Sequence, residues 1–254
     1  MTRVLRAAFA VLIFVAANGA GTASAQWRDS LGTNWNNPGS ALLGTMLNNR
    51  LLADAARKAP GNRKPSAPVG REPGARAGED AGAEAPAMTF RPVAKNLMTH
   101  EIAQTLTNDP KAQRELTSAF EVYLKEFDDQ ARRDREPSYD VGRAAAFFVM
   151  VNYFAATLRE PNDAQADGAQ ATFRAGLAES DTFARMNDRD RQKLYESLVI
   201  LGSFPLHAAT QSAQEGDRDQ EKMFRKFAAV LVKTLIGVPV GQIKLTKTGF
   251  RIEE

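Results

Sequence analysis

Apolar side chains recur every three or four residues along most of the chain beyond residue 109, which is the spacing of one face of an α-helix. The clearest stripe follows Pro110, a residue well suited to the first turn of a helix. Its apolar members are Leu116, Phe120, Tyr123, Leu124 and Phe127. Charged residues fill the other face, so this segment is predicted to be an amphipathic bundle helix. Residues 128–135 are its polar end and are expected to form a solvated turn or helix tail.

Three further segments show the same period, one of them rich in alanine. Their apolar residues are Phe173 and Leu177; Leu194, Leu198, Leu201 and Phe204; and Met223, Phe224, Phe227, Val230, Leu231 and Leu235. Residues 187–190 resemble a capped start for the second of these helices. Pro205 is expected to kink or end it, because proline has no amide hydrogen. Gly237 followed by Pro239 is expected to end the third.

Apolar and polar residues alternate with a period of two near the C-terminus. Ile243 and Leu245 precede residues 247–249, and Phe250 and Ile252 follow them. This pattern predicts either a small β-hairpin or an extended tail packed on the bundle.

Residues 144–157 form the most apolar run outside the N-terminus. Arg143 and Arg159 bracket about ten strongly apolar positions, which is short of the roughly 20 that a membrane-spanning helix needs. The run is therefore predicted to be a core helix. Because it is apolar on nearly every side, it should lie at the middle of the bundle with other helices around it.

Asn152 interrupts this run, and a buried amide without partners costs a few kcal/mol. The simplest expectation is that Asn152 links two helices. The functional alternative is a ligand pocket between facing helices, lined by Asn152, Tyr153, Tyr123 and His207.

The first 25 residues have the pattern of a secretory signal peptide. Two arginines precede an apolar centre, and the small residues Ala23 and Ala25 predict cleavage before Gln26. The chain has no cysteine, so neither a lipid-modified cysteine nor a disulfide is available. With the alanine and arginine bias, this favours a bacterial periplasmic or secreted protein without a transmembrane segment after signal cleavage.

The mature chain divides into three segments. Residues 26–58 are predicted to be an N-terminal arm with a short amphipathic helix, either docked on the main domain, mobile, or available to a partner or membrane surface. Residues 59–87 are rich in Pro, Gly, Ala, Arg and Glu, which predicts a disordered linker. Residues 88–254 are long enough for one sizeable core. The expected fold is all-α, a single bundle of about five to six helices with a short extended C-terminal tail.

The charge balance argues against nucleic acid as a partner. Without Arg3 and Arg6, the mature chain has 31 basic and 30 acidic residues, a net charge of +1. A nucleic-acid binder needs a concentrated positive surface, which this interspersed pattern does not provide.

Several catalytic patterns fail on a single residue. His100 and Glu101 begin like a zinc-protease helix, but Gln104 stands where the second histidine is required. Ser203 lacks the flanking glycines of a nucleophile elbow, and Pro239 interrupts the glycine-rich residues 237–241 where phosphate-binding amides would be needed. No catalytic residue, metal ligand or cofactor is therefore assigned.

Carboxylates leave one enzymatic alternative open. Glu101, Glu115, Glu121 and Glu196 could meet in space as an acid pair for glycoside cleavage, although surface salt bridging is the simpler expectation for each.

Residues 139–141, residues 147–153 and the ending at residues 243–250 together resemble an uncharacterised family of exported bacterial proteins with a C-terminal helical domain of unknown function. The resemblance covers roughly residues 90–252. It implies a signal peptide, a variable spacer and a helical domain, and it carries over no catalytic residue.

The function expected from the sequence is a noncatalytic binding or interaction module in the bacterial envelope or outside the cell, whose partner is an unknown protein or envelope component. The alternatives are an envelope-directed hydrolase that uses carboxylates and a peripheral membrane-surface protein that uses residues 42–58.

Export makes a direct prediction about the mature N-terminus. When the full chain is expressed in a bacterium, mass spectrometry of the periplasmic product should find Gln26 as its first residue. Ala23→Trp should leave the precursor uncut, because signal peptidase accepts small side chains at this position. A wild-type product that retains residues 1–25 contradicts the prediction.

Overall fold

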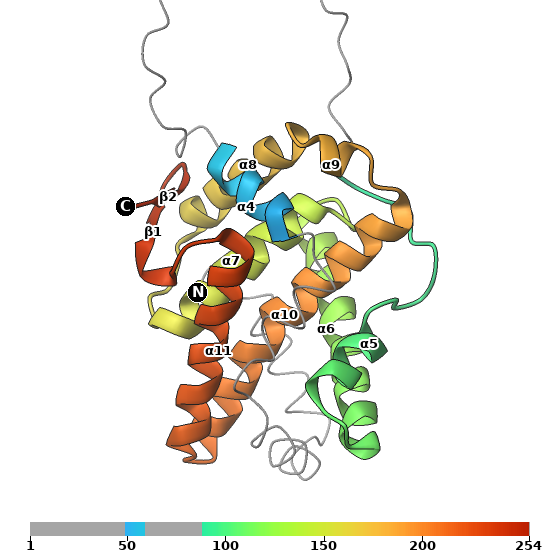
Figure 1. Cartoon of the computed structure of the whole chain (residues 1–254), viewed down its shortest axis with the longest axis vertical. Helices are drawn as coiled ribbons and strands as arrows, with labels where there is room; N and C mark the ends of the chain where they lie inside the picture. Colours follow the sequence, from blue (N-terminus) through green and yellow to red (C-terminus); the bar gives the residue numbers. More distant parts are fainter. Residues whose placement is uncertain (1–48, 59–87, 254) are drawn as a thin grey trace, which may run out of the picture.

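The computed structural model describes residues 49–58 and 88–253 (Figure 1). Its helices are α4 (Asn49–Lys58), α5 (Thr99–Leu106), α6 (Pro110–Asp134), α7 (Val141–Thr157), α8 (Asp163–Ala178), α9 (Asp181–Ala184), α10 (Asp188–Gln214) and α11 (Arg218–Ile236). A 3₁₀ turn (Val240–Gln242) leads to the strands β1 (Ile243–Thr246) and β2 (Gly249–Ile252). The described ranges are thus mostly helical with a short two-stranded tail.

The sequence predicts fewer helices than these ranges contain. The two that it misses, α5 and α9, have eight and four residues, and such short segments give only a weak periodic signal. The predicted signal peptide, the predicted linker and residues 26–48 of the arm lie outside the described residues.

Three helix ends lie where the sequence predicts them. Pro110 is the first residue of α6, and the Asp109 side chain accepts hydrogen bonds from two backbone N–H groups of the first turn. Asn187 caps α10 through the Asp190 N–H. Gly237 ends α11 at φ 83°, a left-handed conformation that glycine adopts without strain. Local capping chemistry therefore sets these boundaries.

Helix α7 lies at the centre of the fold. Thirteen of its 17 residues are buried, on all sides of the helix, and α10, α8 and α11 pack around it. Phe148 is fully buried. Within the described ranges, no helix combines the length and apolar character needed to cross a membrane. The prediction of a core helix is confirmed.

Helix α4 packs on α8 and α11 (Figure 1). Its residues Leu51, Leu52, Ala55 and Ala56 are buried. At Gly176 of α8, an added Cβ would lie 2.1 Å from the Ala55 carbonyl oxygen, so this close approach requires glycine. The apolar side of residues 51–56 is therefore covered by the domain.

The C-terminal segment forms an antiparallel hairpin, one of the two arrangements that its alternation allows. Ile243 pairs with Ile252 and Thr246 with Gly249, which leaves a two-residue turn. The hairpin packs on α8, where the Phe250 ring lies 5.4 Å from that of Phe173.

Helix α10 runs through Pro205 and continues to Gln214. The expectation that the helix could end at Pro205 is therefore wrong. Because Pro205 has no N–H, it cannot bond to the carbonyl of Leu201, four residues earlier. Asn152 of α7 supplies the missing donor: its side-chain nitrogen lies 3.1 Å from the Leu201 oxygen and 2.9 Å from the Phe148 oxygen. The buried amide links two helices, and it does so at the carbonyl that proline leaves unpaired.

This arrangement predicts energetic coupling between Asn152 and Pro205. Asn152→Ala should lower the free energy of unfolding by about 1–3 kcal/mol, because it leaves a buried carbonyl without a donor. In a Pro205→Ala background the alanine N–H can bond to Leu201, so the same change should cost about 1 kcal/mol less. Urea denaturation of the four chains measures the coupling. If the losses in the free energy of unfolding of the two single variants add up to that of the double variant within error, this role of Asn152 is contradicted.

Candidate functional site

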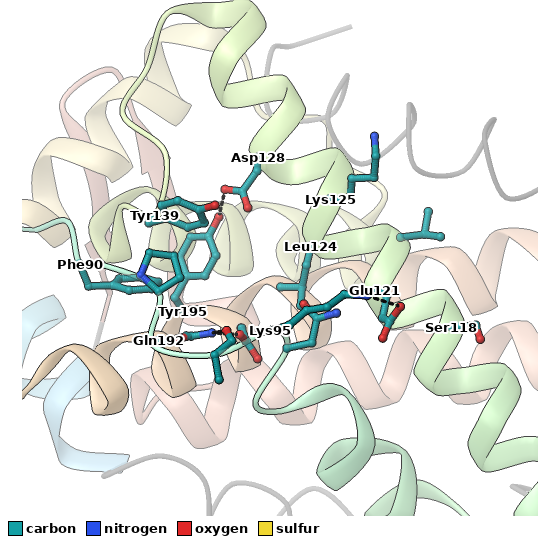
Figure 2. A pocket seen from close by; sticks show the side chains of 15 residues that line it. Phe90, Lys95, Ser118, Glu121, Leu124, Lys125, Asp128, Tyr139, Gln192 and Tyr195 are labelled. Atoms are coloured by element: carbon teal, nitrogen blue, oxygen red, sulfur yellow. Dashed lines mark hydrogen bonds and ion pairs between the residues drawn. The ribbon is translucent and has the colours of Figure 1, made fainter.

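A cleft of about 630 Å³ lies between α6, α10 and the extended segment that precedes α5 (Figure 2). We call residues 90–96 of that segment the strap. The lining residues are Phe90, Pro92, Ala94, Lys95 and Asn96 from the strap; Ser118, Glu121, Val122, Leu124, Lys125 and Asp128 from α6; Tyr139; and Gln192, Tyr195 and Glu196 from α10. The volume is typical of sites for small organic ligands.

Two buried side chains of α10 hold the strap and the start of α5 in place. The Gln192 amide accepts from the Val93 N–H at 2.8 Å and donates to the Ala94 carbonyl at 2.7 Å. Glu196 accepts from the Met98 N–H at 2.8 Å and from the Gln192 amide at 2.7 Å. The side chains thus bind the main chain much as a neighbouring β-strand would, which gives one wall of the cleft a defined position.

Three aromatic rings line one end of the cleft (Figure 2). The Phe90 ring centroid lies 5.3 Å from that of Tyr195 and 5.6 Å from that of Tyr139, and the two tyrosine rings are 6.2 Å apart. Tyr139 has a positive φ of 58°, a conformation that costs a bulky residue about 1–3 kcal/mol. That backbone strain accompanies the placement of its ring beside the other two.

A carboxyl group faces these rings. Asp128 of α6 accepts a 2.6 Å hydrogen bond from the Tyr195 hydroxyl (Figure 2). Burial raises the pKa of Asp128 above its ordinary value, while the Tyr195 bond and the charge of Arg132 act in the opposite direction. Burial and the neighbouring Asp128 raise the pKa of Tyr195 well above its usual value. Asp128 is therefore a partly desolvated acid at the aromatic end of the cleft.

The other acids of the cleft are already engaged. Burial raises the pKa of Glu196. Its two oxygens accept hydrogen bonds from the Met98 N–H and the Gln192 amide. Glu121 lies at the mouth, where its carboxylate is 3.9 Å from the Lys95 ammonium. These side chains are 43% and 84% exposed, so this pair contributes about 0–1 kcal/mol.

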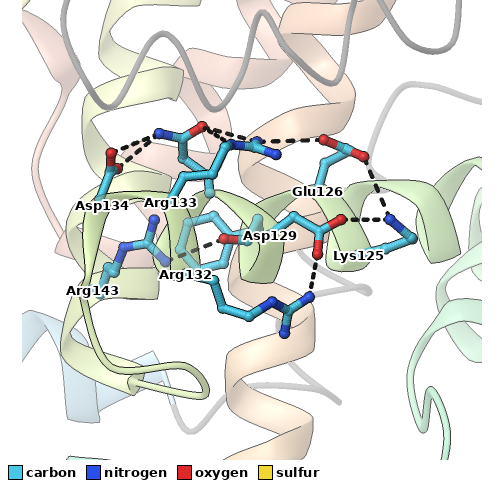
Figure 3. A network of polar contacts seen from close by, with 9 residues as sticks. Lys125, Glu126, Asp129, Arg132, Arg133, Asp134 and Arg143 are labelled. Atoms are coloured by element: carbon cyan, nitrogen blue, oxygen red, sulfur yellow. Dashed lines mark hydrogen bonds and ion pairs between the residues drawn. The ribbon is translucent and has the colours of Figure 1, made fainter.

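The outer face of α6 carries a separate network of charges (Figure 3). Asp129 pairs with both Lys125 and Arg132, and Glu126 pairs with Arg133 at 3.6 Å. Lys125, although it lines the cleft, is thus paired with acids of its own helix. The polar end of α6 is a helix tail with several exposed residues, as expected, but Gln130 and Ala131 are buried and Asp128 lines the cleft.

The four residues proposed for a pocket from the sequence lie elsewhere. The rings of Tyr123 and His207 are 5.7 Å apart, and Asn152 bonds to backbone carbonyls. Tyr153 is buried on α7. None of the four lines the cleft described above. A ligand pocket at these residues stays a prediction.

The sequence did contain a signal for Asp128. It lies four residues after Leu124 and eight after Phe120, so it continues the buried stripe of α6 as a charged residue. Of the four glutamates considered for catalysis, Glu121 and Glu196 do line the cleft, whereas Glu101 and Glu115 do not.

The strap contacts predict different costs for two glutamates of the cleft. Glu196→Ala should lower the free energy of unfolding by about 1–3 kcal/mol, because it leaves the Met98 N–H and one of the two Gln192 amide hydrogens without an acceptor. Amide hydrogen exchange should accelerate across residues 93–98. Glu121→Ala is the matched control and should cost less than about 1 kcal/mol. Equal costs, or unchanged exchange in Glu196→Ala, contradict this role of Glu196.

Comparison with known proteins places the chain in a family. Residues 2–253 match the model of a family of unknown function, DUF6683. No curated protein and no solved structure matches the chain. The match extends over nearly the whole sequence and so includes the cleft and the residues outside the described ranges. The chain belongs to this family of unknown function.

Proposed function

We propose that the protein is a noncatalytic binding module of the bacterial envelope or the extracellular space, and that its ligand is a small organic group held in the cleft between the strap, α6 and α10. The observation that carries this proposal is the cleft itself, about 630 Å³ in volume and lined at one end by three aromatic rings. Export rests on the N-terminal sequence, with its basic start, apolar centre and small residues before Gln26.

The cleft is suited to binding because its walls are fixed before any ligand arrives. Gln192 accepts a hydrogen bond from the strap at Val93, and Glu196 accepts one from Met98 at the start of α5. The Tyr195 hydroxyl donates to Asp128. Folding has already ordered the aromatic side chains that a ligand would contact. Binding therefore costs little further conformational entropy, which favours affinity.

A hydrolase remains the second candidate, because Asp128, Glu121 and Glu196 line one cleft. Two-carboxylate hydrolysis needs an acid free to give its proton to a leaving group and a second free to attack or to activate water. The two oxygens of Glu196 accept hydrogen bonds from the Met98 N–H and the Gln192 amide, and Glu121 faces Lys95. These contacts favour binding over hydrolysis.

The membrane-surface alternative has less support. A surface helix must present its apolar side to lipid. In the described part of the arm, that side contacts α8 and α11, with Leu51, Leu52, Ala55 and Ala56 buried there.

A pair of valine substitutions tests the cleft. Val122 is half-buried and lines the cleft, so Val122→Trp should fill it. Val230 is 46% exposed on α11, and Val230→Trp is the matched control. In ligand-observed NMR with a library of aromatic and aliphatic fragments, wild type and Val230→Trp should bind the same fragments, and Val122→Trp should lose them. Both variants should melt cooperatively, which separates a filled cleft from an unfolded chain.

Two results would overturn the proposal. Fragments that bind Val122→Trp as well as wild type would place binding outside the cleft. Release of soluble products from purified peptidoglycan by wild type, lost in Asp128→Asn, would instead support the hydrolase.

A further inference from the structure

We propose that the ligand of this cleft carries an organic cation, an alkylammonium group, which binds beside the Asp128 carboxylate at the aromatic end of the cleft, against the half-buried ring of Tyr139. This inference rests on the proposed binding function and specifies the chemistry of the ligand. Figure 2 shows Asp128 above the two tyrosine rings, at the opposite end of the cleft from the Lys95–Glu121 pair.

The first observation is the distribution of charge around the cleft. Asp128 takes part in no ion pair with the residues that the structure describes; its hydrogen bonds come from the neutral Tyr195 hydroxyl and the Tyr139 backbone N–H. The two lysines that line the cleft are 84% and 66% exposed, and each has acidic partners of its own: Glu121 for Lys95, and Asp129 and Glu126 for Lys125. The inner, aromatic end therefore carries a negative group without a paired cation.

The nearby arginines are directed elsewhere. The Arg132 guanidinium pairs with Asp129 on the outer face of α6. The Arg143 guanidinium lies over the Phe127 ring, 4.3 Å from its centroid, and donates to the Phe127 carbonyl at 3.2 Å (Figure 3). Their charges act on Asp128 at longer range, and burial outweighs them, because the pKa of Asp128 is raised.

The second observation is the aromatic group itself. A cation is attracted to the face of an aromatic ring within about 6 Å, and the attraction strengthens where water is excluded. Phe90, Tyr139 and Tyr195 lie within 6.2 Å of one another at their centroids and all line the cleft. A cation–π contact of this kind is present beside the cleft. The Arg143 guanidinium lies over the Phe127 ring, and that ring is 5.8 Å from the Tyr195 ring.

Charge then decides between a cationic and a neutral ligand. Both could pack on the rings, but burial of Asp128 disfavours its ionised form, and a bound cation compensates that cost whereas a neutral group does not. An ammonium with methyl groups meets both requirements, since it offers apolar surface to the rings and positive charge to the carboxylate.

Two probes of nearly equal shape test this inference. Choline carries a trimethylammonium group, and 3,3-dimethylbutan-1-ol replaces its nitrogen with carbon and has no charge. By NMR titration, wild type should bind choline at least about tenfold more tightly than the alcohol. Asp128→Asn keeps an acceptor for the Tyr195 hydroxyl but removes the charge, so it should lose this preference. Asp129→Asn, one residue away on the outer face, is the matched control and should retain it.

A second variant tests the inference independently, in case Asp128→Asn fails to fold. Tyr139→Leu removes one ring while leaving the carboxylate, and should weaken choline binding severalfold with little effect on the alcohol. Equal affinity for the two probes in wild type, absence of choline binding, or an undiminished preference in Asp128→Asn would overturn the inference. The cleft proposal fails separately, when neutral fragments bind Val122→Trp as well as wild type.

Discussion

The hydrogen bond from the Asn152 side chain to the Leu201 carbonyl is the contact on which this fold depends. It joins α7, the central helix, to α10, the longest of the described helices, at the carbonyl that Pro205 cannot satisfy. Close packing surrounds it: a Cβ at Gly202 would lie 2.9 Å from the Phe147 ring. A proline that would otherwise weaken α10 is thus tolerated because a neighbouring helix supplies the missing donor.

The continuity of α10 connects this core contact to the cleft. In its second half, Phe204 packs against Phe224 and Phe227 of α11. In its first half, Gln192, Tyr195 and Glu196 line the cleft. One rigid helix therefore carries both the centre of the fold and one wall of the cleft. The side chains that shape the cleft act mainly on other parts of the chain, which leaves Asp128 and the three rings as the groups best placed to meet a ligand.

The helices of the bundle could be predicted because their signals are local. Periodic apolar residues, Pro110, Asn187 and Gly237 each act within a few residues of their own position. The cleft could not be predicted, because its residues come from four separate parts of the chain: the strap, α6, Tyr139 and α10. Asp128 illustrates this limit. Its spacing from Leu124 and Phe120 can be read from the sequence, but its hydrogen-bond partner Tyr195 lies 67 residues away and cannot.

The sequence by itself determined a mostly helical fold with a buried central helix, because burial of a periodic apolar face leaves few other solutions. It also made a link from Asn152 to a second helix the simplest expectation, beside a role in a ligand pocket. Only the tertiary structure decided that α10 continues through Pro205, that residues 49–58 pack on α8, and that Asp128 accepts a hydrogen bond from Tyr195. Each of these depends on a contact between distant segments, whose geometry exists only once the helices have packed.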